Sequence, residues 1–235
     1  MTNKDLSIII PAYKEYECLK KILPELELNL KKLKLSFELI IIDSIQFSKE
    51  TSNLCGKYKA LYFNRSFDDS YGSAIKTGVA SSVGDLVIIM DSDGSHNAGF
   101  ICTLLKHLDD NDVVIASRYI NGGYTDNNLF QVFLSKIVNI IFSKLLGLNI
   151  SDVSNSFRIY KGALLRGLHL KCKHFDIQEE ILVKMIWENS AKILEIPYSF
   201  ERRLYGRSKR SLVIFIIHYF FSLVKFLFLK IKNGY

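Results

Sequence analysis

The residues from Leu86 to His96, LVIIMDSDGSH, constrain the fold of this chain more than any other segment. Consecutive apolar residues without polar alternation are typical of a strand buried on both faces, as in a parallel sheet covered by helices. The run stops at Asp91 and Asp93, whose side chains share one side of an extended chain at the strand end where α/β proteins bind ligands. Two carboxylates there indicate a site for Mg²⁺ or Mn²⁺ with substrate phosphates, and a solvated acidic turn is the alternative.

Apolar, strand-like runs alternate with helical patterns along the chain, which predicts an α/β fold with a mostly parallel sheet flanked by helices. The predicted strands are Leu6–Ala12, Glu38–Asp43, Ala60–Arg65, Leu86–Asp91 and Asp112–Ser117. The predicted helices lie near Glu15–Leu35, Gly72–Val83, Gly99–Leu108, Phe130–Leu146, Phe175–Glu188 and Ser211–Lys230. The segment Asn121–Asn128, NGGYTDNN, is predicted to be a mobile loop, in a place where a lid over a substrate would be useful.

The excess of positive charge lies in the C-terminal part of the chain. Residues 201–235 hold eight of the 31 Lys and Arg residues and one of the 24 Asp and Glu residues, whereas the charges of the other residues cancel. This asymmetry indicates an anionic surface or polyanion near the C-terminus and argues against a nucleic-acid partner. The N-terminal MTNKDLSIII lacks the pattern of a signal peptide, so the globular part is expected in the cytosol.

The cysteines are too widely spaced for a zinc knuckle or a C-x-x-C redox pair, and we expect buried, reduced thiols. They are Cys18, Cys55, Cys102 and Cys172.

The segment Ser211–Leu229 is strongly apolar and is flanked by basic residues. Its length is near the ~20 residues that a membrane-spanning helix needs. Its polar residues, however, fall in one narrow stripe of a helix, which favours a helix that lies in the membrane interface or packs the stripe on the domain. The stripe contains Ser211, His218, Ser222, Lys225 and Lys232. A membrane span and a core helix are the alternatives, and we divide the chain into a domain of residues 1–210 and an appended helix of residues 211–235.

Several blocks of sequence, taken together, carry a resemblance to a known family. The blocks are IIIPAYKE, IIIDS, the stretch from Gly72 to Gly78, GDLVIIMDSDGSH, ASRYINGG, DVSNSFRIY and EIPYSFERRLYGRSK. In this order they resemble family 2 glycosyltransferases of the GT-A fold, in the branch of dolichol-phosphate mannose synthase and polyprenyl-phosphate glycosyltransferases. The resemblance implies an inverting transfer of a sugar from GDP-mannose or a UDP-hexose to polyprenyl phosphate at the cytoplasmic membrane face. Membrane lipid is an implied partner, and a homo-oligomer or a membrane partner subunit is compatible with it.

The resemblance also implies roles for residues on the donor side. Asp93 would be the direct metal ligand for Mg²⁺ or Mn²⁺, with Asp91 near the ribose and the metal. The nucleotide pocket would contain Pro11, Tyr13, Glu15, Asp43 and Gly72. Arg203 and Lys209, in RRLYGRSK, would fold over the phosphates, where a guanidinium fork and a point charge stabilise the leaving group.

On the acceptor side the resemblance implies that Arg118 positions the acceptor phosphate, with Gln131 and Ser135 on the following helix. Relatives commonly have an arginine at the position of Gln131, so a charge is lost there unless Lys136 replaces it. A polyprenyl phosphate is already ionised and needs no general base.

A sugar-hydroxyl acceptor in surface polysaccharide synthesis is the alternative, with Glu179 or Glu180 as the base. A weakly active scaffold subunit is a further alternative, suggested by Lys14, Ser44 and Gln131.

Overall fold

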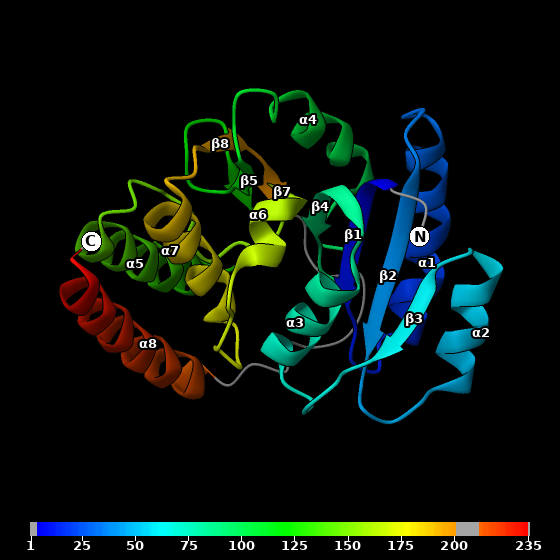
Figure 1. Cartoon of the computed structure of the whole chain (residues 1–235), viewed down its shortest axis with the longest axis horizontal. Helices are drawn as coiled ribbons and strands as arrows, with labels where there is room; N and C mark the ends of the chain where they lie inside the picture. The colour runs from blue at the N-terminus through cyan, green and yellow to red at the C-terminus, as the bar shows by residue number, and fades with distance from the viewer. Residues whose placement is uncertain (1–3, 201–211, 235) are drawn as a thin grey trace.

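The described part of the chain is organised around a seven-stranded sheet with the strand order β3-β2-β1-β4-β7-β5-β8 (Figure 1). The computed structural model describes residues 4–200 and 212–234. The strands of this sheet are β1 (Lys4–Pro11), β2 (Phe37–Asp43), β3 (Leu61–Asn64), β4 (Gly84–Ile89), β5 (Val113–Ser117), β7 (Arg158–Lys161) and β8 (Ile193–Pro197). Only β7 is antiparallel to its neighbours, β4 and β5. The short strands β6 (Tyr124–Thr125) and β9 (Ser199–Phe200) pair in parallel as a second sheet.

Helices cover both faces of the large sheet, as its continuous apolar strands require. The helices are α1 (Tyr16–Lys31), α2 (Lys49–Lys57), α3 (Tyr71–Ser81), α4 (Ile101–Lys106) after a 3₁₀ turn at Ala98–Phe100, α5 (Leu129–Leu146), α6 (Gly162–Gly167), α7 (Ile177–Asn189) and α8 (Leu212–Asn233). Alternate residues of β1 enter two cores: Ile8 and Ile10 pack with α1, α2 and α4, and Ile9 packs with α3 and α5 to α8. The layered arrangement is visible in Figure 1.

All five predicted strands and all six predicted helices are confirmed, with boundaries shifted by a few residues. The sequence interpretation missed α2, α6, β7, β8 and the two-stranded sheet. One strand of that sheet, β6, lies inside the segment Asn121–Asn128, so this predicted loop contains a paired strand. The prediction that it moves as a lid stays a prediction.

All four cysteines are free thiols, as predicted. Three of them are buried, but Cys102 is half-buried on α4, so the prediction of burial is wrong for that residue. The buried residues of α4, Ile101 and Leu104, are three positions apart and share one face of the helix. Cys102 points away from that face and therefore lies at the edge of the core.

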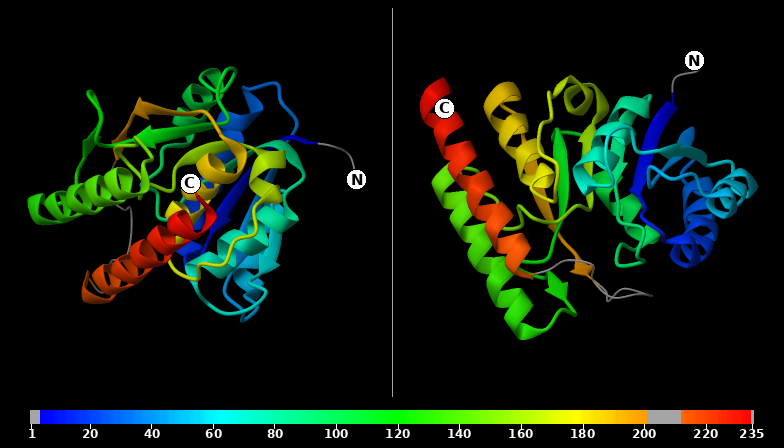
Figure 2. Two further views of the ribbon diagram at one scale, coloured as in Figure 1. Left: turned by 60° about the vertical axis from the view of Figure 1, so that its left-hand side comes forward. Right: turned by 90° about the horizontal axis from the view of Figure 1, so that it is seen from below.

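The helix predicted at the C-terminus is present as α8, and it lies beside α5 (Figure 2). The Nζ atom of Lys230 donates to the carbonyl oxygen of Leu145 at 3.3 Å, so the C-terminal ends of the two helices meet. Within the predicted polar stripe, Ser222 is buried against the domain, whereas Lys225 and Lys232 are exposed, although Lys225 Nζ reaches to 3.5 Å from Cys172 Sγ. The predicted stripe therefore packs on the domain at Ser222, while Ser211 and the side chain of His218 lie outside what the structure describes.

Candidate functional site

The two aspartates singled out by the sequence lie just after β4, at its carboxyl end. The side chain of Asp91 is 27% exposed, and its Oδ1 accepts a hydrogen bond from the hydroxyl of Tyr71 at 3.2 Å. Asp93 is buried, and its Oδ1 accepts from the backbone N–H of Ser95 at 3.1 Å and from the Ser95 hydroxyl at 2.5 Å. These bonds fix the turn, so one carboxylate faces outward and the other is held beneath it.

A buried histidine supports the same turn from below. His96 stacks on Phe157 with ring centroids 4.6 Å apart, and burial lowers the pKa of its imidazole. The Nδ1 atom accepts from the backbone N–H of Asp91 at 2.9 Å, so the neutral ring carries its proton on Nε2. That Nε2 lies 4.0 Å from Asp91 Oδ2 and has no hydrogen-bond partner among the described residues. His96 therefore holds Asp91 from its backbone side and turns a polar atom toward its carboxylate.

The donor set suits a hard divalent cation that keeps open positions for a substrate. The described residues contain no group of three or more His, Cys, Asp or Glu side chains that could hold a metal ion by themselves. Mg²⁺ is typically bound by one or two carboxylates plus substrate phosphates, and this is what Asp91 and Asp93 offer. The chemistry of the pair thus fits the predicted Mg²⁺ or Mn²⁺.

The residues predicted around the nucleotide lie at the ends of β1 and β2. Pro11 closes β1 and pairs with Ile42, and Asp43 is the buried last residue of β2. The Oδ2 of Asp43 accepts from the Tyr62 hydroxyl at 3.4 Å, while its Oδ1 accepts from the next backbone N–H at 2.8 Å. Tyr13 and Glu15 follow in the loop before α1, where Glu15 accepts from Cys18 Sγ at 3.4 Å. The ends of two adjacent parallel strands therefore place these side chains at one edge.

An arginine that was not assigned to the site ties this edge together. Arg65 is buried, and its Nη2 donates to the carbonyl oxygen of Ala12 at 2.6 Å. Its Nη1 donates to the carbonyl oxygens of Asp69 and Ser70. The guanidinium carbon lies 5.3 Å from the centre of the Tyr13 ring, and burial lowers the pKa of Arg65. Arg65 thus connects the loop after β1 to the N-terminus of α3.

Gly72, predicted at the nucleotide, has a packing role in the structure. Its backbone N–H donates to the carbonyl oxygen of Lys173 at 2.7 Å. A Cβ atom on it would lie 2.5 Å from the carbonyl oxygen of Cys172, so only glycine allows α3 to approach this segment. Its N–H is therefore already bonded inside the protein, and a nucleotide contact by Gly72 stays a prediction.

Arg118, predicted at the acceptor phosphate, is held in a bidentate ion pair that the sequence did not reveal. Its Nε donates to Asp152 Oδ2 at 2.8 Å and its Nη2 donates to Asp152 Oδ1 at 2.7 Å. Nη2 also donates to the Ser154 hydroxyl at 3.0 Å, and the guanidinium lies over the rings of Tyr119 and Phe200. Burial opposes the charge, yet attraction to Asp152 outweighs it and raises the pKa of Arg118. A phosphate at Arg118 stays a prediction, and it would meet a guanidinium already engaged through two of its nitrogens.

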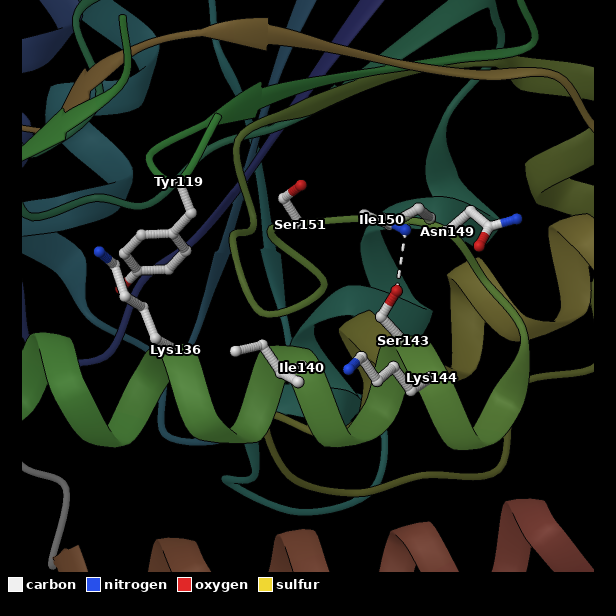
Figure 3. A pocket seen from close by; sticks show the side chains of 8 residues that line it. All are labelled: Tyr119, Lys136, Ile140, Ser143, Lys144, Asn149, Ile150 and Ser151. Carbon is white, nitrogen blue, oxygen red and sulfur yellow. Dashed lines mark hydrogen bonds between the residues drawn. The ribbon is translucent and has the colours of Figure 1, made fainter. Parts of the chain in front are cut away.

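The other predicted acceptor residues lie on the first turns of α5. Gln131 is exposed and Ser135 is half-buried. Farther along α5, Lys136 Nζ lies 5.8 Å from the centre of the Tyr119 ring, on a cavity of about 380 Å³ (Figure 3). Ile140, Ser143, Lys144 and the loop residues Asn149, Ile150 and Ser151 complete its lining. The cavity places Lys136 beside Tyr119, the residue that follows Arg118 in the chain. Neither Gln131 nor Ser135 lines the cavity.

The two glutamates predicted as an alternative base are both buried in the first turn of α7. Burial raises the pKa of Glu179 to about 8, and its Oε1 accepts from the Tyr219 hydroxyl at 2.7 Å. Glu180 Oε2 accepts from the backbone N–H groups of Lys171 and Cys172, at 2.8 and 2.6 Å. Both side chains therefore bond to the protein itself rather than face an opening. Arg203 and Lys209, predicted over the phosphates, lie outside the described residues.

The curated proteins to which the chain is similar include transferases named for dolichol phosphate or undecaprenyl phosphate. The chain is 27% identical over 213 residues to a dolichol-phosphate mannosyltransferase of Pyrococcus furiosus, covering 87% of this chain and 58% of the relative. It is 27% identical over 215 residues to an undecaprenyl-phosphate 4-deoxy-4-formamido-L-arabinose transferase of Photorhabdus laumondii, covering 88% of this chain and 63% of the relative. The chain thus spans about three fifths of the length of these relatives.

Solved structures and a family model agree with the fold and place the chain in a family. Glucosyl-3-phosphoglycerate synthase of Mycobacterium tuberculosis, in complex with Mn²⁺, uridine diphosphate and phosphoglyceric acid, superposes with a TM-score of 0.71 at 16% identity. The match covers 95% of this chain and 78% of that one, and it shows the GT-A fold. The model of glycosyl transferase family 2 matches residues 7–168, which is more than half of the chain. The chain therefore belongs to glycosyl transferase family 2.

Proposed function

We propose that this protein transfers a sugar from a nucleotide diphosphate sugar to a polyprenyl phosphate at a membrane surface. The observation that carries the proposal is the pair Asp91 and Asp93 at the carboxyl end of β4, beside the edge formed by Pro11 and Asp43. The names of the curated relatives support the acceptor class, since each is a transferase acting on a dolichyl or undecaprenyl phosphate.

The donor half of the reaction needs negative charge to be stabilised as the anomeric bond to the diphosphate breaks. A divalent cation bound by Asp91 and Asp93 would supply that stabilisation at the diphosphate oxygens. The protein's own contribution is to hold the two carboxylates, through the bonds of Tyr71 and Ser95, in the orientation that the cation requires. Arg203 and Lys209 are proposed to add positive charge at the leaving group.

The acceptor half is better served by a phosphate than by a sugar hydroxyl. A phosphate monoester is ionised at neutral pH, so it needs positioning rather than deprotonation. A hydroxyl would need a general base within hydrogen-bond reach. Glu179 and Glu180 are both buried and bonded to Tyr219 and to the backbone before α7, which disfavours the alternative that uses either as the base.

The surface beside the acceptor helix supports a membrane as the place of reaction. α5 is long and apolar enough to cross a membrane, and only 17% of it is buried inside the protein. It lies beside α8 (Figure 2). The two helices expose large apolar side chains: Leu129, Phe130, Phe133, Ile140 and Leu145 on α5, and Phe220, Phe221, Val224, Phe228 and Ile231 on α8. Large exposed apolar side chains gathered on two adjacent helices are typical of a membrane-facing site. Because α8 buries Tyr219, Ser222 and Phe226 against the domain, we propose a helix pair that lies in the interface rather than a lone span.

The transfer proposal is tested with the purified chain, Mn²⁺, and radiolabelled GDP-mannose or UDP-glucose, in the presence of vesicles that contain polyprenyl phosphate. We expect label to become extractable into organic solvent, and we expect Asp93→Ala to abolish this transfer without loss of the fold. Label that appears only in a water-soluble glycan would favour the hydroxyl-acceptor alternative. Failure to bind any nucleotide sugar in the presence of Mn²⁺ would contradict the proposal and favour a scaffold subunit.

The membrane proposal is tested by cosedimentation with vesicles of anionic phospholipid at low salt. Phe133→Ser on α5 and Phe228→Ser on α8 should each weaken binding, because both side chains are more than half exposed on the proposed surface. Leu28→Ser is the matched control, since Leu28 is 60% exposed on α1, which covers the opposite face of the sheet. Equal binding by all three variants and the unchanged chain would refute the surface.

A further inference from the structure

We propose that Tyr71 is a positioning residue for the Asp91 carboxylate, and that Gln178 sets the direction of the Tyr71 hydroxyl bond. The inference rests on the proposed metal-dependent function and concerns residues that lie outside the sequence motifs. Tyr71 begins α3, and Gln178 lies in the first turn of α7, 107 positions away along the chain. The two side chains meet beside Asp91, in the loop that follows β4.

The three side chains form one continuous line of hydrogen bonds. The Nε2 of Gln178 donates to the hydroxyl oxygen of Tyr71 at 3.1 Å, and the Tyr71 hydroxyl donates to Asp91 Oδ1 at 3.2 Å. The Tyr71 ring also stacks on Phe175, with ring centroids 4.4 Å apart and an interplanar angle of 22°. The stacking fixes the plane of the ring, so the hydroxyl cannot leave Asp91 without breaking an aromatic contact.

The amide nitrogen of Gln178 determines which atom donates in each of these two hydrogen bonds. An amide nitrogen can only donate, so the Tyr71 oxygen must accept from Gln178 and use its single proton for Asp91. The opposite orientation of the amide would make two acceptors compete for that proton. Asp91 would then face a lone pair of the phenol oxygen, which repels a carboxylate. Gln178 therefore selects the arrangement in which Oδ1 of Asp91 is bonded and Oδ2 remains directed toward a ligand and His96.

The backbone of Gln178 is fixed beside Tyr71 by contacts of its own. It is 1% exposed, and its backbone carbonyl oxygen accepts from Nη1 of the buried Arg158 at 2.9 Å, while its side-chain Oε1 has no hydrogen-bond partner among the described residues. The neighbouring residues of the same turn are tied to α8: Ser222 donates to Asp176 Oδ2 at 2.6 Å, and Tyr219 donates to Glu179 at 2.7 Å. The turn that carries Gln178 is thus fixed on both sides, which keeps the Tyr71 hydroxyl aimed at Asp91.

The test measures binding of Mn²⁺ in the presence of UDP or GDP, by the electron paramagnetic resonance signal of the free ion. Tyr71→Phe removes the hydroxyl and keeps the stacked ring. A hydrogen bond to a charged group contributes enough that we expect about a tenfold weaker affinity for Mn²⁺. Gln178→Glu should weaken it at least as much, because the new carboxylate accepts the phenol proton. Tyr58→Phe, at the end of α2, is the matched control and should bind Mn²⁺ like the unchanged chain.

The thermal midpoints of the same variants separate positioning from a structural role. Tyr71→Phe should unfold within a few degrees of Tyr58→Phe while it binds Mn²⁺ more weakly. Unchanged affinity for Mn²⁺ in both Tyr71→Phe and Gln178→Glu would overturn the inference and leave the proposed function standing. A loss of affinity that only parallels a large loss of thermal stability would also overturn it. If the unchanged chain bound no Mn²⁺ with either nucleotide, the proposed function and this inference would both be refuted.

Discussion

Glu179 makes the stability of this fold depend on pH in an unusual direction. It is fully buried, and burial raises the pKa of its carboxyl group from the ordinary 4.5 to about 8. The Tyr219 hydroxyl and the charge of Arg158 act against this rise, and the charge of Asp176 adds to it. Between about pH 5 and 8 the unfolded chain has lost the proton and the folded chain still holds it. The free energy of unfolding therefore falls as pH rises, by up to about 1.4 kcal/mol per pH unit.

Glu179→Gln removes this dependence and keeps an acceptor for Tyr219. Over three pH units the wild-type contribution amounts to roughly 4 kcal/mol, so the variant should gain stability relative to the wild type progressively from pH 5 to 8. Urea unfolding followed by circular dichroism at pH 5, 6, 7 and 8 measures this difference. Glu188→Gln is the control, because Glu188 is exposed near the end of the same helix. Parallel pH profiles for the wild type and Glu179→Gln would refute the reasoning.

Three further perturbations have expected outcomes. Gly72→Ala should lower the free energy of unfolding by about 2 kcal/mol in urea, since its Cβ would meet the Cys172 backbone; wild-type stability would refute the close approach. Arg118→Lys should cost about 2 kcal/mol in the same assay, because lysine cannot replace the bidentate pair with the buried Asp152, and an unchanged midpoint would contradict this. Native thiol titration should modify Cys102 first, and Cys102→Ser should remove that fast phase; a fast phase that persists would show another exposed thiol.

The strands that could be predicted are those in which burial dictates an apolar run. β1, β2 and β4 contain consecutive Ile, Leu and Val residues because helices cover both faces. β7 escaped prediction because it has four residues and begins with Arg158, whose guanidinium donates to the carbonyl oxygens of Val153 and Gln178 rather than pairing with a nearby carboxylate in the sequence. β8 escaped because Glu195 interrupts it, and that carboxylate accepts from the Ser117 hydroxyl and from backbone N–H groups near Asp152. In both strands a charged residue, buried in β7 and half-buried in β8, interrupts the apolar signal.

The candidate site also contains residues that could be predicted from the sequence and residues that could not. Asp91 and Asp93 could be found from sequence because the end of an apolar strand marks the place where ligands bind. The groups that hold them could not, because Tyr71 reaches Asp91 across 20 positions and Gln178 reaches Tyr71 across 107. Neither side chain has a local pattern that distinguishes it from an ordinary aromatic or polar residue. Asp152, the partner of Arg118, was hidden for the same reason, 34 positions away.

The C-terminal helix shows how one pattern can serve two purposes. A narrow polar stripe on an apolar helix predicts equally a face toward lipid headgroups and a face toward a protein with polar partners. Ser222 of the stripe faces the domain, because its hydroxyl donates to the buried Asp176 before α7, and the nearby Tyr219 donates to Glu179 in the first turn of α7. The side of α8 that carries Tyr219, Ser222 and Phe226 is therefore used by the domain, while Lys225, Lys232 and several large apolar side chains of α8 are exposed, as are apolar side chains of α5. The turn of α7 that receives these bonds also carries Gln178, so the helix proposed to lie in the membrane supports the carboxylate proposed to bind the donor.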